Sequence, residues 1–516
     1  MRLAYGLILL FIAAVLLMFG CDLIGPVDSG SPENGGEEDP VDGNGEESSD
    51  GMTAAWARTV TTGDSWSFFE SVAVDAGGNV YAAGFISGTG TYTFGPEVTA
   101  AGSSEHHNAV LVKYDNAGNA KWARTVNTGN DYSAFHSVAV DAGGNVYAAG
   151  YVSGIETYTF GPGVTVEGSS TVWNVVLVKY NTAGNAQWAR TVETNFETDL
   201  YSGFMSVLVG SDGSVYAAGY VHGAGATFGP DVWTLGSNLD GNTVLVKYDS
   251  AGNAQWARTV STGNDRSAFD SVAVDAGGNL YAGGYIYGTD TYTFGPEVTA
   301  AGSSEHHNAV LVKYDSAGNA QWARTVSSGD LASRFHSVAV TGGEKVYAAG
   351  RISGSGTYTF GPGVTVAGSS AVYNVALLKY DLAGTAHWAR TVSTGSDWSA
   401  FHSVAVDAGG NVYASGFIVG SDTYTFGPGV ATEGSSHEEN AVFVKYDNSG
   451  NAEWIRTASS GDPGSASIFS SLAIDGSGDL YVSGAMAGSE TYTFGPGVTA
   501  AGTSDRSNVV LVQYSE

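Results

Sequence analysis

The sequence has a single cysteine and few basic residues. Cys21 is the one cysteine among 516 residues, so the chain cannot form an internal disulfide. Lysines and arginines together number 20 against 51 aspartates and glutamates, which gives a formal net charge of −31. A surface with this excess of acids repels phosphate groups, so the composition excludes nucleic acid as a partner.

Charged residues as a whole are also scarce, whereas glycine is abundant. Charged residues make up 14% of the chain, and 74 residues are glycine. Average proteins contain about 25% charged residues and about 7% glycine. This composition favours a turn-rich β protein. The chain is also longer than the roughly 250–300 residues that one hydrophobic core serves, so we expect several domains or a repeat array.

One long apolar run occurs, at the amino terminus. Residues 7–19 are all apolar, they follow the single charge of Arg2, and they end at Gly20-Cys21. We interpret residues 1–20 as a secretory signal peptide, because the run is shorter than the roughly 20 residues that span a membrane. An uncleaved membrane anchor is the alternative interpretation.

Cys21 follows a small residue at the end of this run and resembles the lipobox cysteine of bacterial lipoproteins. Phe19 departs from that pattern, in which Ala or Ser usually stands at this position. The resemblance implies that the signal is removed and that the Cys21 thiol carries fatty acids such as palmitate. Two or three acyl chains hold a protein stably on a membrane. We therefore expect a lipoprotein of the cell envelope, anchored to the inner or outer membrane and facing the periplasm or the cell surface.

The segment that follows is strongly acidic. Residues 22–52 contain ten acidic residues and no basic one, mixed with Gly, Ser, Pro and Asn. Such a segment cannot bury a core, and its charges repel one another. We predict that residues 21–53 are a lipidated cysteine and a disordered linker, which holds the folded part away from the membrane.

The remainder of the chain, residues 54–516, consists of seven copies of one unit. Each copy has a Trp-Ala-Arg element (Trp-Ile-Arg in the last) and a Phe-Gly-Pro triplet, and successive tryptophans are 66, 66, 68, 66, 66 and 66 residues apart. The tryptophans are Trp56, Trp122, Trp188, Trp256, Trp322, Trp388 and Trp454.

Each unit contains four short stretches with the alternating pattern of β-strands. In the first unit they are residues 69–75, 79–85, 109–115 and 120–126, and tight Gly- and Asn-containing turns join the first pair and the last pair. Strands joined so closely are antiparallel neighbours. Four such strands in a unit that cannot bury both sheet faces alone predict a β-propeller blade, with the small-sided first strand innermost.

The ends of the chain predict how the ring closes. By this assignment the folded part begins on an outermost strand, residues 55–60, and ends on a third strand, residues 509–514. We expect the amino-terminal strand to complete the last blade, which would cover an exposed sheet edge. The predicted fold is therefore an all-β, seven-bladed β-propeller, and we expect a monomer.

Three repeated segments resemble the bacterial β-propeller repeat family known as SBBP. They are Ser-Val-Ala-Val-Asp, Gly-Asn-Val-Tyr-Ala-Ala-Gly and Val-Leu-Val-Lys-Tyr-Asp, and the resemblance covers about residues 54–516. It implies the propeller fold and an exported location but little about chemistry. The stretch from Asp115 through Gly118 to Trp122 is also similar to the tryptophan-docking element of quinoprotein propellers. We expect no cofactor.

Long connections, residues 61–68 and 87–108 in the first unit, are expected on one face of the ring, which makes that face the candidate binding surface. Two positions there vary among otherwise similar copies. The position three residues before the inner-strand Phe is aromatic in four copies: Trp66, Tyr132, Tyr201 and Trp398. The position after the Phe reads Glu70, His136, Met205, Asp270, His336, His402 and Ser470. Each copy also supplies a nearby acid: Asp64, Asp131, Asp199, Asp265, Asp330, Asp397 and Asp462.

Aromatic platforms beside carboxylates suit sugars, or a peptide with basic groups. The alternative interpretation is that each aspartate caps its own turn and that exposed positions drift. A zinc site needs ligands that converge on one point. Of the three histidines at the position after the Phe, His136, His336 and His402, only the last two fall in neighbouring units. We therefore predict no metal. We expect Arg58, Lys113 and their equivalents to form ion pairs on the outer strands.

Three functions remain open from the sequence. The first is a non-catalytic binding or scaffolding lipoprotein for a glycan, peptide or protein partner. The second is a polysaccharide lyase or hydrolase, although a hydrolase needs two carboxyls about 5–9.5 Å apart in distinct environments, and acids repeated sevenfold lack that singularity. The third, by analogy of fold alone, is an accessory factor in outer-membrane assembly. We favour the first and predict no catalytic residues.

Overall fold

The computed structural model describes residues 51–194, 200–223, 225–341, 345–460 and 462–515. Residue contacts divide the chain into Met1–Gly51 and Met52–Glu516, and the fold reported below is that of the second unit. The predicted signal peptide and Cys21 lie outside the described residues. All regular elements within the described ranges are β-strands. In those same ranges, no helix has the length and apolar character needed to span a membrane.

The described strands include seven four-stranded antiparallel sheets, which we number in chain order. Sheet 1 consists of β2 (Ser67–Val74), β3 (Val80–Ser87), β6 (His107–Tyr114) and β7 (Ala120–Thr125). Sheet 2 consists of β8 (Ser133–Val140), β9 (Val146–Ser153), β12 (Trp173–Tyr180) and β13 (Ala186–Thr191). Sheet 3 consists of β15 (Ser202–Val209), β16 (Val215–Val221), β19 (Asn242–Tyr248) and β20 (Ala254–Arg258).

The remaining four sheets follow the same order of strands. Sheet 4 consists of β21 (Ser267–Val274), β22 (Leu280–Tyr287), β25 (His307–Tyr314) and β26 (Ala320–Thr325). Sheet 5 consists of β27 (Ser333–Val340), β28 (Lys345–Ser353), β31 (Tyr373–Asp381) and β32 (Ala386–Arg390). Sheet 6 consists of β33 (Ser399–Val406), β34 (Val412–Val419), β37 (Glu439–Tyr446) and β38 (Ala452–Thr457). Sheet 7 consists of β40 (Ser467–Ile474), β41 (Leu480–Ala487), β44 (Ser507–Ser515) and β1 (Thr53–Arg58).

Local sequence explains the tight turn between the first two strands of sheet 1. The carboxylate of Asp75 accepts hydrogen bonds from the amides of Gly77 and Asn79, both at 2.9 Å, and from the hydroxyl of Tyr81 at 2.9 Å. Gly78 has a φ of 75°, a left-handed conformation that glycine adopts without strain. The repeated Asp-x-Gly-Gly-Asn sequence therefore reverses the chain and pairs β2 with β3.

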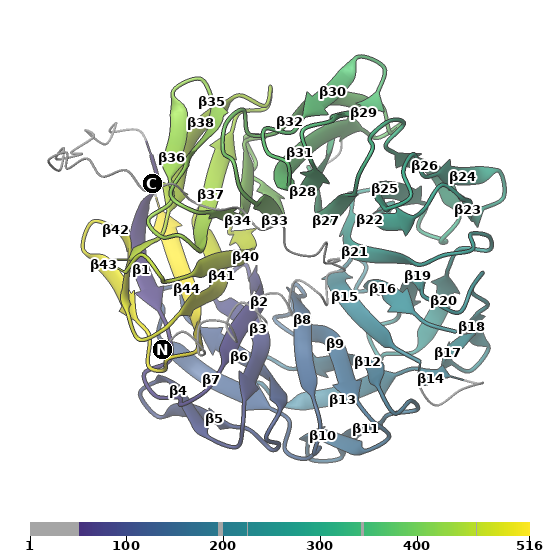
Figure 1. Ribbon diagram of the computed structural model, residues 1–516. Coiled ribbons are helices and arrows are strands. Elements are labelled where there is room, and N and C mark those ends of the chain that lie inside the picture. Colours follow the sequence, from purple (N-terminus) through teal and green to yellow (C-terminus); the bar gives the residue numbers. More distant parts are fainter. Residues whose placement is uncertain (1–50, 195–199, 224, 342–344, 461, 516) are drawn as a thin grey trace, which may run out of the picture. The chain divides into compact units, whose positions relative to one another are not determined.

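The first strand of each sheet lies nearest a common centre. Figure 1 shows β2, β8, β15, β21, β27, β33 and β40 around that centre, with the fourth strands outside. Each of these inner strands contacts the sheet that precedes it in this order, and β2 contacts β40 and β41 of sheet 7. Repeated four-stranded antiparallel sheets in this arrangement form a β-propeller, as the sequence predicts.

Each unit contains a feature that the sequence reading missed. The long connection between the second and third strands folds into a small hairpin around the Phe-Gly-Pro triplet, as in β4 (Thr91–Gly95) and β5 (Val98–Ala101). The hairpin contacts β7, the outermost strand of its sheet, and Figure 1 places the hairpins at the periphery. The predicted loop surface at residues 87–108 is therefore largely a rim structure rather than a channel mouth.

The other hairpins are β10 (Thr157–Gly161) with β11 (Val164–Glu167), β17 (Ala226–Gly229) with β18 (Val232–Thr234), β23 (Thr291–Gly295) with β24 (Val298–Ala301), β29 (Thr357–Gly361) with β30 (Val364–Ala367), β35 (Thr423–Gly427) with β36 (Val430–Glu433), and β42 (Thr491–Gly495) with β43 (Val498–Ala501). Two short strands, β14 (Glu193–Thr194) and β39 (Ser459–Ser460), pair with β17 and β42.

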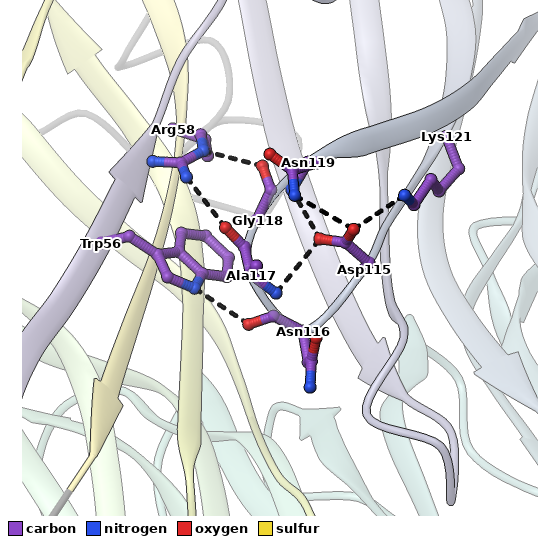
Figure 2. A network of polar contacts seen from close by, with 8 residues as sticks. All are labelled: Trp56, Arg58, Asp115, Asn116, Ala117, Gly118, Asn119 and Lys121. Atoms are coloured by element: carbon purple, nitrogen blue, oxygen red, sulfur yellow. Dashed lines mark hydrogen bonds and ion pairs between the residues drawn. The ribbon is translucent and has the colours of Figure 1, made fainter.

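Arginines of the Trp-Ala-Arg elements bind carbonyls of the next sheet, which corrects our expectation of ion pairs for the arginines. Two equivalents of Lys113 do form ion pairs, Lys247 with Asp212 and Lys445 with Glu453. The Arg58 Nε and Nη2 groups donate to the carbonyls of Gly118 and Ala117 at 2.7 and 2.9 Å, and the Trp56 indole donates to the carbonyl of Asn116 at 3.1 Å (Figure 2). The guanidinium carbon of Arg58 also lies 5.0 Å from the Trp56 ring centroid. Arg124, Arg190, Arg258, Arg324 and Arg390 repeat this contact on the following sheets.

The contact differs where the two ends of the folded unit meet. β1 pairs antiparallel with β44, with Ala54 opposite Tyr514 and Arg58 opposite Leu511. The third and fourth strands of sheet 7 therefore come from opposite ends, and no turn joins them. Arg456 of sheet 6 donates instead to the carbonyl of Met52, at 3.2 Å.

We predict that this docking contact tolerates no side chain on its glycine. Gly184 has a φ of 76°, and a Cβ atom there would lie 2.8 Å from the Trp122 ring. Gly163 has a φ of 73°, but a Cβ there would meet nothing within 4 Å. Gly163→Ala should lower the free energy of unfolding by about 1–2 kcal/mol through backbone strain alone. Gly184→Ala should cost about 1–3 kcal/mol more, because the Trp122 ring must move.

Urea unfolding of the two variants measures both costs. Equal losses in the two variants would show that the tryptophan–glycine packing contributes nothing.

Candidate functional site

The variable position after the inner-strand Phe is a β-bulge. In sheet 1 the register shifts between Phe69 and Ser71, so Glu70 has no partner on β3. The same shift occurs at the equivalent place in the other six sheets. A bulge redirects a side chain away from the regular alternation of its strand. These residues can therefore vary without changing the pairing of the sheet, and they belong to the strand nearest the centre.

Two of the predicted residues contact each other between sheets 1 and 2. The His136 Nδ1 atom contacts the Glu70 Oε2 atom, and the two side chains are 8% and 11% exposed. The His136 ring centroid lies 5.3 Å from that of Tyr151, on β9. Burial, reinforced by the charge of Glu70, raises the pKa of Tyr151 well above its ordinary value. The phenol is therefore protonated at neutral pH.

Asp270 forms a buried ion pair with a residue that the sequence reading did not single out. Arg334 Nε and Nη2 lie 2.5 and 2.8 Å from the two carboxylate oxygens of Asp270, and the side chains are 5% and 3% exposed. Burial raises the pKa of Asp270, whereas the charge and hydrogen bonds of Arg334 oppose that rise. The two-point geometry fixes the orientation of both groups.

His336 and His402 are neighbours, as predicted, and both are partly buried. Their ring centroids are 5.5 Å apart, and His336 Nδ1 lies 3.8 Å from Asp270 Oδ2. Burial, followed by the positive charges of Arg351 and Arg334, lowers the pKa of His402 to about 3. The same causes hold the pKa of His336 well below its ordinary value. Both imidazoles are therefore neutral at physiological pH. Among the described residues, no group of three or more His, Cys, Asp and Glu side chains is placed to hold a metal ion.

The four predicted aromatic side chains each pack on the preceding sheet, near the start of its third strand. Tyr201 is 40% exposed, and the other three are half-buried. The pairs are Tyr132 with His106 at 4.3 Å, Tyr201 with Trp173 at 5.4 Å, Trp398 with Tyr373 at 5.2 Å, and Trp66 with the guanidinium of Arg506 at 5.6 Å. The platforms therefore exist, and part of each is already covered by a neighbour.

The predicted acids make local hydrogen bonds, which supports the turn-capping interpretation for four of them. The carboxylates of Asp131, Asp265 and Asp397 accept from the amide of the next residue at 2.7–2.8 Å. Asp462 accepts from the amide of Gly464 at 2.9 Å. Asp64 and Asp330 are exposed, and Asp199 lies outside the described residues.

The sequence reading missed the second strand as a source of site residues. One residue of each second strand pairs with the residue that precedes the Phe of the first strand. In sheets 1 to 7 this second-strand residue is Phe85, Tyr151, Tyr220, Tyr285, Arg351, Phe417 and Ala485. The preceding Ala-Ala-Gly sequence varies little, so the variation begins one residue after the repeated Gly-Asn-Val-Tyr-Ala-Ala-Gly segment. The same comparison of copies would have found Arg334, which replaces Ala134, Ala268 and Ala400.

Glu439 is a second missed residue. It begins β37, at the position where sheet 1 has His107 and sheet 5 has Tyr373, and it is 8% exposed. Burial, reinforced by the charges of Glu438 and Asp397, raises its pKa from 4.5 to about 7. The folded protein therefore binds a proton here that the unfolded chain releases at lower pH.

We predict that Glu439 makes the protein less stable as the pH rises. Because its folded pKa is the higher one, the stability that the protonated carboxyl provides is present below pH 4.5 and is lost as the pH rises through about 7. Glu439→Gln should flatten this part of the curve of melting temperature against pH. The exposed Glu490 provides the control, since Glu490→Gln should leave the curve unchanged. A Glu439→Gln curve that keeps the wild-type slope would contradict the prediction.

Comparisons with known proteins show what the chain is similar to and leave its chemistry open. No protein-family model matches the chain. The chain is 25% identical over 427 residues to an uncharacterized WD repeat-containing protein of Acanthamoeba polyphaga mimivirus, a match that covers 69% of this chain and 30% of that protein. The chain thus spans less than a third of the length of this curated relative.

Two solved structures illustrate the structural similarity. The WD40 β-propeller domain of Doa1 has a TM-score of 0.42 and 10% identity, with 90% of this chain and 98% of that chain covered. The virginiamycin B lyase of Staphylococcus aureus has a TM-score of 0.42 and 8% identity, with 88% and 97% covered.

Proposed function

We propose that the seven sheets are the blades of one closed seven-bladed propeller. Seven serine hydroxyls support this proposal, because each accepts a hydrogen bond from an inner-strand amide of the next sheet. In sheet 2, for example, the Val138 amide donates to Ser71 at 3.1 Å. The series returns to its start, since the Val72 amide donates to Ser471 at 3.2 Å. The pairing of β1 with β44 supports the same closure.

The propeller is proposed to be the folded part of an exported lipoprotein. The apolar run before Cys21, the position of that cysteine and the acidic residues that follow it support this assignment. So does the resemblance of the repeats to the SBBP family. The lipid anchor would place the propeller in the cell envelope, facing the periplasm or the cell surface.

The proposed activity is non-catalytic binding of a glycan, peptide or protein partner. The observation that carries it is the position of the variable residues. Side chains that differ among otherwise similar copies gather on the inner strands and beside the aromatic platforms, as Glu70 with His136 and Tyr373 with Trp398 show. Aromatic faces next to polar groups bind sugar rings and peptide side chains.

A polysaccharide lyase is the alternative, and one observation favours it. The carboxylate of Glu70, the imidazole of His136 and the phenol of Tyr151 lie in succession between sheets 1 and 2. A carboxylate that orients an imidazole is the arrangement of a general base. The lyase would need this group to reach a bound sugar, whereas the binding function needs no proton transfer.

Binding to glycan and peptide arrays tests the proposal. We expect the full chain to bind a subset of probes, and Trp66→Ala and Trp398→Ala each to reduce that binding by about tenfold or more, because each removes an aromatic platform. Trp233→Ala is the control, since Trp233 is 60% exposed on the hairpin strand β18 at the periphery.

Two outcomes would contradict this function. Unchanged binding in both platform variants would show that the aromatic platforms do not bind the partner. Release of unsaturated sugars that stops in a His136→Ala variant would instead establish the lyase.

Metabolic labelling with palmitate tests the anchor. We expect the wild-type protein to incorporate the label and to fractionate with membranes, and Cys21→Ser to do neither, because the thiol is the acceptor. Label in the Cys21→Ser variant, or none in the wild type, would remove the proposed location.

A further inference from the structure

The outer hairpin of sheet 3 exposes large apolar side chains to solvent. Trp233 lies on β18, and Leu235 and Leu239 lie in the connection between β18 and β19. Their exposed fractions are 60%, 59% and 60%, and they are three of the six large hydrophobic residues that are exposed in the described ranges. Single apolar residues on a surface are ordinary, whereas a group of them marks an interaction surface.

Local structure groups the three residues. β18 alternates buried and exposed residues, and Trp233 and Leu235 are two positions apart, so their side chains point to the same side. The Leu239 carbonyl accepts a hydrogen bond from the Gly223 amide at 3.1 Å. Leu235 Cδ2 lies 3.6 Å from the place that a Cβ atom on Gly225 would occupy. Both leucines therefore lie beside one short segment, and we call the three residues the sheet-3 apolar patch.

The other six copies of the unit have small or polar residues at all three positions. Trp233 is replaced by Thr in five copies and by Ala in one, and Leu235 is replaced by Ala in four copies and by Glu in two. The position of Leu239 has Glu in two copies and Asp, His, Thr or Ala in one copy each. The fold therefore does not need large apolar side chains here. Their joint occurrence in one copy indicates a surface that contacts something else.

Charge and size argue against a second protein chain on this patch. Asp231 and Asp240 are exposed beside it, and the chain has a formal net charge of −31. A symmetric dimer places the same surface of both copies together, so these acids would face their own equivalents. A standard protein interface also uses about 20–30 residues from each partner, far more than this patch supplies. A surface with positive groups outside and apolar groups beneath fits the patch better, and a zwitterionic lipid bilayer is such a surface.

The length of chain before the folded unit supports a lipid surface. The 31 residues from Asp22 to Met52 separate Cys21 from β1. A chain of that length spans at most about 110 Å. The proposed acyl anchor on Cys21 therefore keeps the folded unit within reach of a bilayer. Tethering raises the effective concentration of a second contact, so a contact made by only a few side chains suffices.

We propose that Trp233, Leu235 and Leu239 insert into the headgroup region of a zwitterionic bilayer. This inference rests on the proposed lipid anchor. Tryptophan and leucine are favoured on the apolar side of elements that lie in a membrane interface, and a tryptophan ring attracts the ammonium groups of the lipid headgroups. Asp231 and Asp240 attract the same ammonium groups. The contact orients the tethered unit with sheet 3 toward the bilayer.

Fluorescence quenching by brominated lipid tests this contact. Cys21 is the single thiol, so the full chain can be coupled through it to phosphatidylcholine vesicles that contain a maleimide lipid, whether or not cells acylate this residue. All 11 tryptophans belong to the folded unit, so the quenching reports on that unit alone. Brominated phosphatidylcholine should lower the wild-type emission by about one part in 11, the share of Trp233. Trp233→Thr should show no such loss.

Variants that copy residues of the other copies keep the test independent of misfolding. Leu235→Glu and Leu239→Glu retain Trp233 and introduce residues that other copies have at these positions, so we expect both to melt at the wild-type temperature. Both should lose the quenching, because the transfer of a carboxylate out of water is costly. Ile155, which is 60% exposed on sheet 2, supplies the matched control, and Ile155→Ala should keep the quenching.

Equal quenching in the wild type and in Trp233→Thr would overturn the inference, and so would quenching that survives both glutamate substitutions. Dimers in sedimentation that dissociate in Trp233→Thr would assign the patch to a second copy instead of a bilayer. Loss of array binding in Trp233→Ala would assign it to a peptide or glycan. Palmitate labelling tests the anchor separately, so absence of label together with intact quenching would remove the proposed location alone.

Discussion

The structure depends on the contact by which each sheet binds the next one through backbone carbonyls. The arginine of one sheet donates to two consecutive carbonyls of the following turn, while the tryptophan packs against the glycine there, as Arg58 and Trp56 do at Gly118. Hydrogen bonds to charged donors contribute about 1.5–3 kcal/mol each. Because this contact lies on the outer strands and the serine–amide contacts lie on the inner ones, the spacing of neighbouring sheets is set by residues that take no part in the candidate site.

That separation explains how the inner strands can hold groups that a hydrophobic core would not accommodate. Bulge residues such as Glu70 and Asp270 do not belong to the paired register of their strands. A change of charge at a bulge affects the neighbouring bulge and second-strand residues but not the backbone hydrogen bonds between the strands. The ion pair of Asp270 with Arg334 is therefore a local arrangement, and other sheets reach stable packing with Met205 or Ser470 at the same position.

The sheet topology could be predicted, because seven copies of one unit show the same pattern of strands and turns. The pairing of β1 with β44 followed from where the copies begin and end. Three features could not be read from the sequence. The hairpin at 91–101 is too short to show strand periodicity, and the carbonyl targets of Arg58 leave no side-chain signature. Arg334 and Arg351 come together only through the register of β27 with β28.

The use of backbone carbonyls as acceptors affects how a chain of this kind can gain further units by duplication. A side chain that recognises another side chain must change together with it, whereas every peptide unit offers the same oxygen atom. Any copy of the unit can therefore stand beside any other without a compensating substitution. The identity of residues 91–115 with 291–315 is what such interchangeable modules would leave behind after one was duplicated into a distant position. The junction at Met52 and Arg456 is the one place where this freedom ends, since there the acceptor belongs to the start of the folded unit instead of to a repeated turn.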